Sequence, residues 1–449
     1  MSSTRSLADS LREGVSCPVL TDDSALERYS FDFGNMRPKR PQVVVRARCE
    51  EDVVHTLRVA RALGVPVSSR GSGHSIGGQC LSEGIVLAHD AEAGEARMLE
   101  DGCVEATCRS RWKRVERTLS AAGRMFPLYT NQLRTSVGGT LSVGGYGVRS
   151  FVAGAQVDHV ERARLILPDG QAVWCSREEN AELFRYALAG LGQVGVLERV
   201  VLRGLPERSF ARLQMNRHRN LREMVDTLAW TADWKGPAPE LFFAEHKAGK
   251  LWSIFGSLHE TEAAAQASAH PEPLVRMERE RVHMVVKSDV LHKGEDQGEV
   301  FDPNTCQVMA DYCLDLEGLR RFVAFLEAEP SRFWLPGLDL LRVLGLSRPE
   351  DGGRWPFELR AAFGGTSRVY GIGLYYQVRR SDQAGLAAVR AAHRACLEKC
   401  LELGGRPYLY GWMELDRDAR QAVYGQDYAR MRTLRQELDP RGLLNPEAL

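Results

Sequence analysis

The 449-residue sequence lacks an excess of either charge, a long apolar run and closely paired cysteines. Lysine and arginine together number 59, as do aspartate and glutamate, so the formal net charge is zero. A neutral chain carries no electrostatic footprint for nucleic acid or for a strongly charged partner. No run approaches the roughly 20 apolar residues that a membrane helix needs. The sequence therefore favours a protein that acts on small molecules, with neither nucleic acid nor membrane among its partners.

The cysteines and the first residues predict the compartment. The ten cysteines are scattered without a CxxC pair, which is typical of reduced thiols. The opening residues MSSTRSLADSLREG contain no apolar run long enough for a signal peptide. We therefore expect a cytoplasmic protein.

One cysteine-rich helix raises the question of a metal site. A helical spacing of apolar residues between Leu386 and Leu403 places His393, Cys396 and Cys400 near one face. That face also carries leucine and valine, which favours packing in the core over metal binding. We predict no metal.

The length and the order of the predicted elements indicate more than one domain. Residues 41–47 are rich in β-branched side chains and predict a strand; residues 49–64 have helical spacing, and residues 65–69 predict a second strand. Strands and helices then alternate as far as a Gly-Leu-Pro turn, and an aromatic C-terminal segment is expected to pack back on the first domain. We predict an α+β fold with three segments, residues 1–206, 207–400 and 401–449.

Glycine-rich stretches follow several of the predicted strands. The stretch VPVSSRGSGHSIGGQCLSEGIVL, residues 65–87, does not have the spacing of a dinucleotide-binding Rossmann turn, because the third glycine is misplaced and a strand follows instead of a helix. Main-chain N–H groups in such a loop could still hold a pyrophosphate. Two more glycine-rich stretches, residues 129–147 and 189–202, could contact the same ligand. Together they fit an extended dinucleotide better than isolated turns do.

Four segments resemble a known family. RGSGHSIGGQ, SVGGTLSVGG, LFRYALAGLGQVGVLERV and LDPRGLLNP occur in this order and are similar to signature segments of FAD-linked oxidases of the vanillyl-alcohol oxidase superfamily, with PCMH-type FAD binding, and most of all to cytokinin dehydrogenases. The resemblance covers about residues 38–205 and 400–449. It implies an FAD-binding domain of two α/β subdomains, formed by both ends of the chain, and an inserted α+β substrate (cap) domain.

The resemblance also implies a covalently bound FAD. The histidine of the RGSGHS loop, His74 here, is the residue that the family joins to the flavin 8α-methyl group. Neutral imidazole is a competent nucleophile, and an unlinked histidine beside the ring is the alternative. A second link through cysteine is not implied, because the matching segment carries Gln132. The other implied cofactor contacts are Arg70, Gly71, Ser72, Gly73, Ser75, Gln79, Asn131, Ser136, Gly138, Gly139, Ser142, Gly195, Leu197, Tyr410 and Asn445.

One position departs from the family. In cytokinin dehydrogenases an aspartate at a fixed distance before the VGGTLS segment accepts the proton, and here that position is Asn131. An amide can orient a substrate but cannot act as a general base near neutral pH. Either another group takes the proton or the substrate is not a cytokinin, and we favour the second. Candidate bases in predicted strands of the cap are Glu245 and Tyr376, together with His246 and Tyr375.

These observations predict an FAD-dependent oxidoreductase. It would transfer a hydride from a small alcohol, an amine or a secondary metabolite to covalently bound FAD, with dioxygen as the expected acceptor. Oxidase and dehydrogenase are not distinguished, and the oligomeric state stays open. The alternatives are a berberine-bridge-type oxidase of sugars or alcohols, a flavin-binding protein without catalysis and, less in keeping with the glycine spacing, an NAD-linked dehydrogenase.

Overall fold

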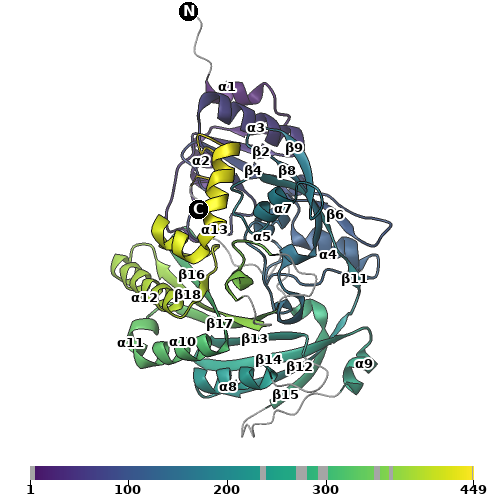
Figure 1. Cartoon of the computed structure of the whole chain (residues 1–449), viewed down its shortest axis with the longest axis vertical. Coiled ribbons are helices and arrows are strands. Elements are labelled where there is room, and N and C mark those ends of the chain that lie inside the picture. The colour runs from purple at the N-terminus through teal and green to yellow at the C-terminus, as the bar shows by residue number, and fades with distance from the viewer. Residues whose placement is uncertain are drawn as a thin grey trace, which may run out of the picture.

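The computed structural model of the chain describes residues 6–232, 239–268, 281–291, 302–347, 354–363, 368–446 and 448. Helices and antiparallel and parallel strands are mixed along these residues, so the predicted α+β fold is confirmed (Figure 1). Three sheets of four, five and eight strands, together with a small two-stranded sheet, form the framework. No helix of the described residues has the length and apolar character to cross a membrane.

The first sheet carries the predicted β-α-β unit. Its strands, in spatial order, are β1 (Val19–Leu20), β2 (Val43–Ala47), β4 (Ile85–His89) and β3 (Val67–Arg70), and the last three are parallel. Helix α3 (Glu50–Leu63) joins β2 to β3 and ends at Gly64, whose φ of 72° suits a left-handed C-cap. Two short helices, α1 (Leu7–Arg12) and α2 (Asp23–Arg28), precede this unit. The first glycine-rich loop begins directly after β3.

The second sheet is antiparallel and follows in the chain. Its spatial order is β5 (Ala96–Met98), β6 (Val104–Thr107), β10 (Val196–Leu202), β8 (Val160–Ile166) and β9 (Ala172–Ser176). The helices in this part are α4 (Trp112–Ser120), α5 (Val137–Leu141), α6 (Ser150–Ala153) and α7 (Ala181–Ala187). Strands β7 (Arg124–Met125) and β11 (Leu205–Pro206) pair with each other. The second glycine-rich stretch passes through α5 and therefore lies beside this sheet.

The third sheet, called the cap sheet below, has eight antiparallel strands. Their spatial order is β15 (Arg281–Lys287), β12 (Phe210–His218), β14 (Lys250–His259), β13 (Leu241–Lys247), β17 (Leu338–Ser347), β18 (Arg368–Arg379), β16 (Thr305–Leu314) and β19 (Arg406–Pro407). The helices between these strands are α8 (Leu221–Ala232), α9 (Glu262–Ala267), α10 (Leu316–Ala328), α11 (Pro330–Phe333) and α12 (Gln383–Glu402). Figure 1 shows α8, α10 and α11 on the side of the sheet away from the first two sheets.

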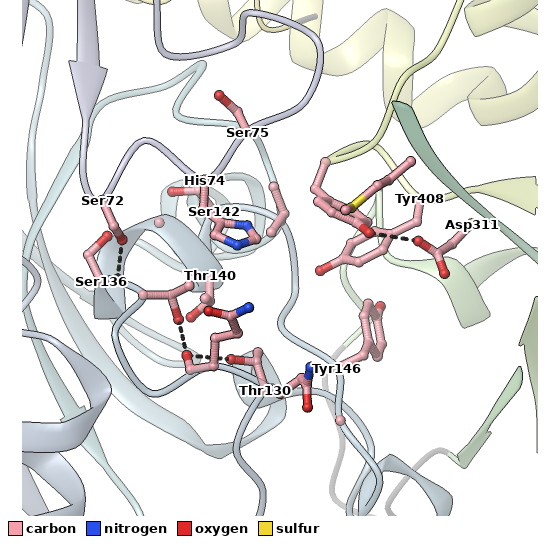
Figure 2. Close-up of a pocket in the computed structure, with 18 of the residues that line it drawn as sticks. Ser72, His74, Ser75, Thr130, Ser136, Thr140, Ser142, Tyr146, Asp311 and Tyr408 are labelled. Atoms are coloured by element: carbon pink, nitrogen blue, oxygen red, sulfur yellow. Dashed lines mark hydrogen bonds between the residues drawn. The ribbon is translucent and has the colours of Figure 1, made fainter. Parts of the chain in front are cut away.

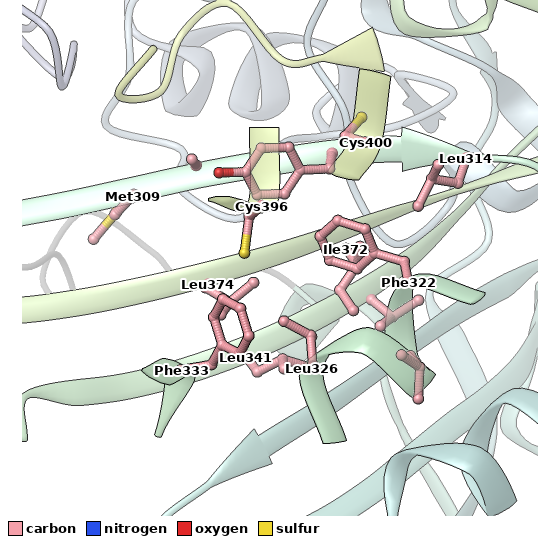
Figure 3. Packing of buried hydrophobic residues seen from close by; sticks show 14 of the residues in the cluster. Met309, Leu314, Phe322, Leu326, Phe333, Leu341, Ile372, Leu374, Cys396 and Cys400 are labelled. Carbon is pink, nitrogen blue, oxygen red and sulfur yellow. The ribbon is translucent and has the colours of Figure 1, made fainter. Parts of the chain in front are cut away.

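An apolar core separates the cap sheet from its helices. Every second residue of β18 from Tyr370 to Val378 belongs to this core, in which Ile372 lies near Phe322 of α10 and Leu374 near Phe333 of α11 (Figure 3). Cys396 and Cys400 of α12 are fully buried in the same cluster. This burial confirms the prediction that the 386–403 helix packs its cysteines in the core. Burial of apolar and thiol groups stabilises this layer.

The end of the chain returns to the first two sheets. Helix α13 (Arg417–Leu438) buries Tyr424, Tyr428 and Met431 in the cluster around the second sheet, and Leu444 forms a bridge with Val67 of β3. In Figure 1 this yellow helix lies against the purple and teal part of the chain. The segment boundaries at residues 206 and 400 stay a prediction; the strands of the cap sheet run from Phe210 to Pro407.

Candidate active site

A cavity of about 620 Å³ lies between the glycine-rich loops and the cap sheet. One wall is formed by the loop after β3, by residues 129–148 and by residues 191–197, and the opposite wall by strands β13, β16, β17 and β18. Figure 2 shows Ser72, His74 and Ser136 on the loop side, with Asp311 and Tyr408 facing them. A cavity of this size with both apolar and polar walls is typical of a site for a cofactor and a small substrate.

Most residues predicted from the sequence meet in this cavity, although they come from distant parts of the chain. The predicted residues that line it are Gly71, Ser72, Gly73, His74, Ser75, Gln79, Asn131, Ser136, Gly138, Gly139, Ser142, Gly195, Leu197, Glu245, Tyr410 and Asn445. Their contacts with a cofactor stay a prediction.

Arg70 was predicted as a cofactor contact, but it lies outside the set of residues that line the cavity. Its Nη1 donates to the carbonyl of Phe31 at 2.7 Å, and its guanidinium lies 5.3 Å from the ring of Tyr29. A Cβ at Gly73 would lie 2.5 Å from Arg70 Nη2, so the side chain packs closely against the glycine loop.

The two glycine-rich loops touch each other at the cavity wall. The backbone N–H of Ser136 donates to Ser72 Oγ at 2.8 Å. A Cβ on Gly71 would collide with Ser136 Oγ, and a Cβ on Gly139 would lie 2.8 Å from the same atom. The glycines are needed here because they let two main chains approach closely.

A buried carboxyl that the sequence did not reveal holds the first loop. Asp32 accepts hydrogen bonds from Ser75 Oγ at 2.9 Å, from Gly78 N at 2.8 Å and from Asn35 N at 3.0 Å. Burial raises the pKa of Asp32, and these three hydrogen bonds act in the opposite direction. Nothing in the local pattern around Asp32 distinguishes it from a surface aspartate, because its partners are more than 40 residues away in the chain for two of the three bonds.

The C-terminal segment is fixed to the loops by two amide side chains. Gln79 Nε2 donates to the carbonyls of Leu409 at 3.1 Å and Tyr410 at 3.2 Å. Asn445 accepts from Ser69 N and donates to the carbonyl of Gly192, each at 2.8 Å. Both amides were predicted as cofactor contacts, and both also join segments that are hundreds of residues apart.

His74 points into the cavity (Figure 2) and is stacked on Phe33, with ring centroids 4.3 Å apart and an interplanar angle of 13°. Burial, with a smaller contribution from the charge of Arg134, lowers the pKa of His74 to about 4. The imidazole is therefore neutral near pH 7, which is the form with a nucleophilic nitrogen.

A carboxyl–tyrosine cluster faces the loops from the cap sheet, and its carboxyl group, that of Asp311, was not among the residues predicted from the sequence. Asp311 of β16 accepts from Tyr375 Oη at 2.8 Å and from Tyr410 Oη at 2.9 Å, one bond to each carboxyl oxygen. Burial raises the pKa of Asp311, and the two hydrogen bonds and the charge of Arg342 oppose this rise. Burial and the charge of Asp311 raise the pKa values of both tyrosines, so their hydroxyls stay protonated and donate.

The four candidate bases from the cap occupy two different faces of the sheet. Glu245 lines the cavity, where its Oε1 accepts from Arg342 Nε at 2.8 Å, and Tyr375 lines it as well. Tyr376 is a correction, because it is fully buried in the core behind the sheet and donates to the carbonyl of Phe333 at 2.7 Å. His246 also does not line the cavity. Successive residues of a strand alternate between its faces, so neighbours such as 375 and 376 cannot both reach the cavity.

Comparison with known proteins connects this cavity with flavin chemistry. Residues 41–176 match the family model of an FAD binding domain. An uncharacterized oxidoreductase of the fasciation locus of Rhodococcoides fascians is 37% identical over 191 residues, which are 41% of this chain and 42% of that relative. Cytokinin dehydrogenase 1 of Oryza sativa subsp. japonica is 37% identical over 188 residues, 40% of this chain and 35% of that relative. The matched part thus spans less than half the length of each relative.

A solved structure extends the similarity of fold to almost the whole chain. A chitooligosaccharide oxidase superimposes with a TM-score of 0.77 over 98% of both chains, at 14% sequence identity. The predicted fold and the predicted resemblance to FAD-linked oxidases and cytokinin dehydrogenases are confirmed by these matches. Oxidoreductase, the predicted class of enzyme, is the class to which all three named proteins belong.

Proposed function

We propose that the protein is an FAD-dependent oxidoreductase that removes a hydride from a small alcohol, amine or secondary metabolite. The observation that carries the proposal is a single cavity in which the glycine-rich loops face the cluster of Asp311, Tyr375 and Tyr410. One wall thus has the features of a nucleotide site, and the other has a group that can accept a proton.

The loop wall fits FAD by its chemistry. Gly71, Gly73 and Gly139 leave main chain exposed to the cavity at places where a Cβ would meet a neighbouring side chain. Bare main-chain N–H groups beside serine hydroxyls suit the pyrophosphate of a dinucleotide. The cavity continues from these loops to Tyr408 and Tyr410, so an extended ligand has room along it.

His74 is the residue that we propose is bonded to the flavin. Its imidazole is neutral, faces the cavity and is held in one orientation by the stacked ring of Phe33. An orientation fixed before the ligand binds reduces the entropy that attachment costs.

Asp311 is the group that we propose accepts the proton of the substrate. When bound, the isoalloxazine ring of FAD supplies the acceptor for the hydride. Tyr375 or Tyr410 can receive a substrate proton while passing its own to Asp311, since both hydroxyls already donate to that carboxylate. Burial makes Asp311 more basic than an ordinary aspartate, which favours this role near neutral pH. Asn131, whose amide cannot serve as a base, is left to orient the substrate.

This arrangement favours an alcohol over an amine. Removing a hydride from an alcohol leaves an O–H proton that must depart at the same time, whereas a neutral amine needs no base for hydride loss. Hydroxyl groups that relay to a carboxylate meet the need of the alcohol. Dioxygen as the electron acceptor and a cytoplasmic location are part of the proposal.

The spectrum of the purified protein tests the cofactor and its linkage together. Yellow colour should stay with the protein after acid precipitation and leave with the supernatant in His74→Ala. Peroxide formation should be measured with a panel of alcohols, sugars and amines. Colourless folded protein with no affinity for FAD would exclude the proposal, and a yellow protein that no compound bleaches would favour a flavin-binding protein without catalysis.

A further inference from the structure

Four strands of the cap sheet each contribute one residue to a row that faces the cavity. Glu245 of β13 lies opposite Arg342 of β17, Arg342 lies opposite Gly373 of β18, and Gly373 lies opposite Asp311 of β16. Directly opposite residues of neighbouring strands point to the same face, and the strands are about 4.8 Å apart. Along the row, an acidic residue, a cationic residue, a glycine and a second acidic residue follow one another.

Gly373 leaves a gap in the row, and the carboxyl of Asp311 occupies it. A Cβ at residue 373 would collide with Asp311 Oδ1 and would lie 2.9 Å from Tyr375 Cε1. Gly371 is two residues earlier on the same face, and there the nearest atom to an added Cβ is Leu346 Cδ1 at 3.9 Å. Position 371 thus has room for a methyl group, whereas position 373 has none while Asp311 keeps its place.

Arg342 supplies the positive charge of the row. Its Nε donates to Glu245 Oε1 at 2.8 Å and its Nη2 to the same oxygen, with only 19% of its side chain exposed. Although burial opposes the charge, the carboxylate of Glu245 raises the pKa of Arg342, so the guanidinium stays protonated. This fixed cation interacts electrostatically with Asp311 and Tyr375 as well as with Glu245.

We propose that Gly373 and Arg342 are positioning residues for proton transfer: Gly373 leaves the space in which the Asp311 carboxyl reaches Tyr375 and Tyr410, and Arg342, fixed by Glu245, supplies the cation of the same row and so favours the ionised form of that carboxyl. The inference rests on the proposed role of Asp311. The ionisable groups around Asp311 are Tyr312 on its own strand, Arg342, Tyr375, Tyr408 and Tyr410, with Glu245 acting through Arg342. Arg342 is the cation of this group.

Charge variants test the role of Arg342. The activity kcat/KM should fall at low pH as Asp311 becomes protonated, which gives the pH profile an acid limb. In Arg342→Met this limb should move to higher pH by about one unit, because the loss of an attracting cation raises the pKa of Asp311. Arg342→Lys should restore most of the shift. The double variant R342M/E245Q also removes the carboxylate that pairs with Arg342, so it should recover any lost thermal stability. An unmoved limb in Arg342→Met would show that Arg342 serves packing alone and would overturn the inference.

A matched pair of glycine variants tests the gap. Gly373→Ala should lower kcat at least tenfold with the FAD content unchanged, and its crystal structure should show the Asp311 carboxyl moved away from Tyr375. Gly371→Ala adds the same methyl group to the same strand and face, and it should keep the acid limb of the wild type. Equal effects of the two variants, or an unmoved carboxyl in Gly373→Ala, would overturn the role of Gly373.

A second readout separates this inference from the proposed function. The ionisation of Asp311 can be followed by ¹³C NMR of protein labelled in aspartate, with Asp311→Asn identifying the signal. In R342M the titration should move to higher pH than in the wild type, whether or not flavin is present. A wild-type protein that holds no flavin would refute the proposed function, whereas an unmoved titration in R342M would refute the inference about Arg342.

Discussion

The two walls of the cavity are built in opposite ways. The loop wall is rich in glycine and serine from stretches that are almost continuous in the sequence, such as residues 71–75 and 136–142. The cap wall is built from side chains of several strands, apolar ones such as Phe243 and polar ones such as Asp311 and Arg342. A site for a bound nucleotide needs exposed backbone, while proton transfer needs a few groups at fixed distances, and each wall supplies one of these.

The variant Asp311→Asn should have the largest effect, and it distinguishes the role of the cap wall from that of the loop wall. We expect kcat to fall by about 10²- to 10⁴-fold, because a general base contributes that much. The FAD content should not change, because Asp311 belongs to the cap wall. Stopped-flow reduction of the flavin measures the first quantity and visible absorbance the second, and loss of FAD together with activity would show that the walls are not independent.

The converse variant is His74→Ala on the loop wall. The flavin should no longer remain with the acid-precipitated protein, while a smaller share of the activity is lost than in Asp311→Asn, because the proton acceptor is intact. Added FAD should restore part of the remaining activity. Acid-stable colour in this variant would place the linkage elsewhere.

The buried histidines of the two regions should respond alike to acid in protein that carries no flavin on His74. Burial lowers the pKa of His74 and of His393, in the core behind the cap sheet, to about 4. Since the unfolded chain binds the proton near pH 6.5, stability is present above that pH and is lost as the pH falls from 6.5 to 4. His393→Gln should remove up to about 3 kcal/mol of this pH dependence, which denaturant unfolding at pH 7 and pH 4.5 measures. An unchanged pH dependence would show that His393 is not buried as a neutral base.

The smallest effects are expected from two variants, Tyr375→Phe and Tyr376→Phe, which test the two faces of strand β18. Tyr375→Phe removes a hydrogen bond to Asp311 and should lower kcat and move its pH dependence. Tyr376→Phe removes a bond to Phe333 in the core and should cost about 1 kcal/mol of stability, with kcat unchanged. If Tyr376→Phe altered kcat and Tyr375→Phe did not, the assignment of the faces would be wrong.

The fold class, the β-α-β unit before the first loop and about half of the residues that line the loop wall could be predicted from the sequence. Glycines, serines and His74 occur there in short continuous motifs, and the conformation that such motifs adopt is largely local. Arg70 is the exception, because the side on which a residue at the end of a strand lies depends on what packs beside it.

On the cap wall, Asp311, Arg342 and Gly373 could not be predicted from the sequence. Asp311, Arg342 and Gly373 are separated by 31 residues or more, and they meet because of the pairing register of three strands. A shift of one residue in that register would turn Tyr375 to the core and Tyr376 to the cavity, so the face of each side chain is not readable from composition or motif. The place of Asp311, the proposed proton acceptor, is therefore set by the sheet as a whole.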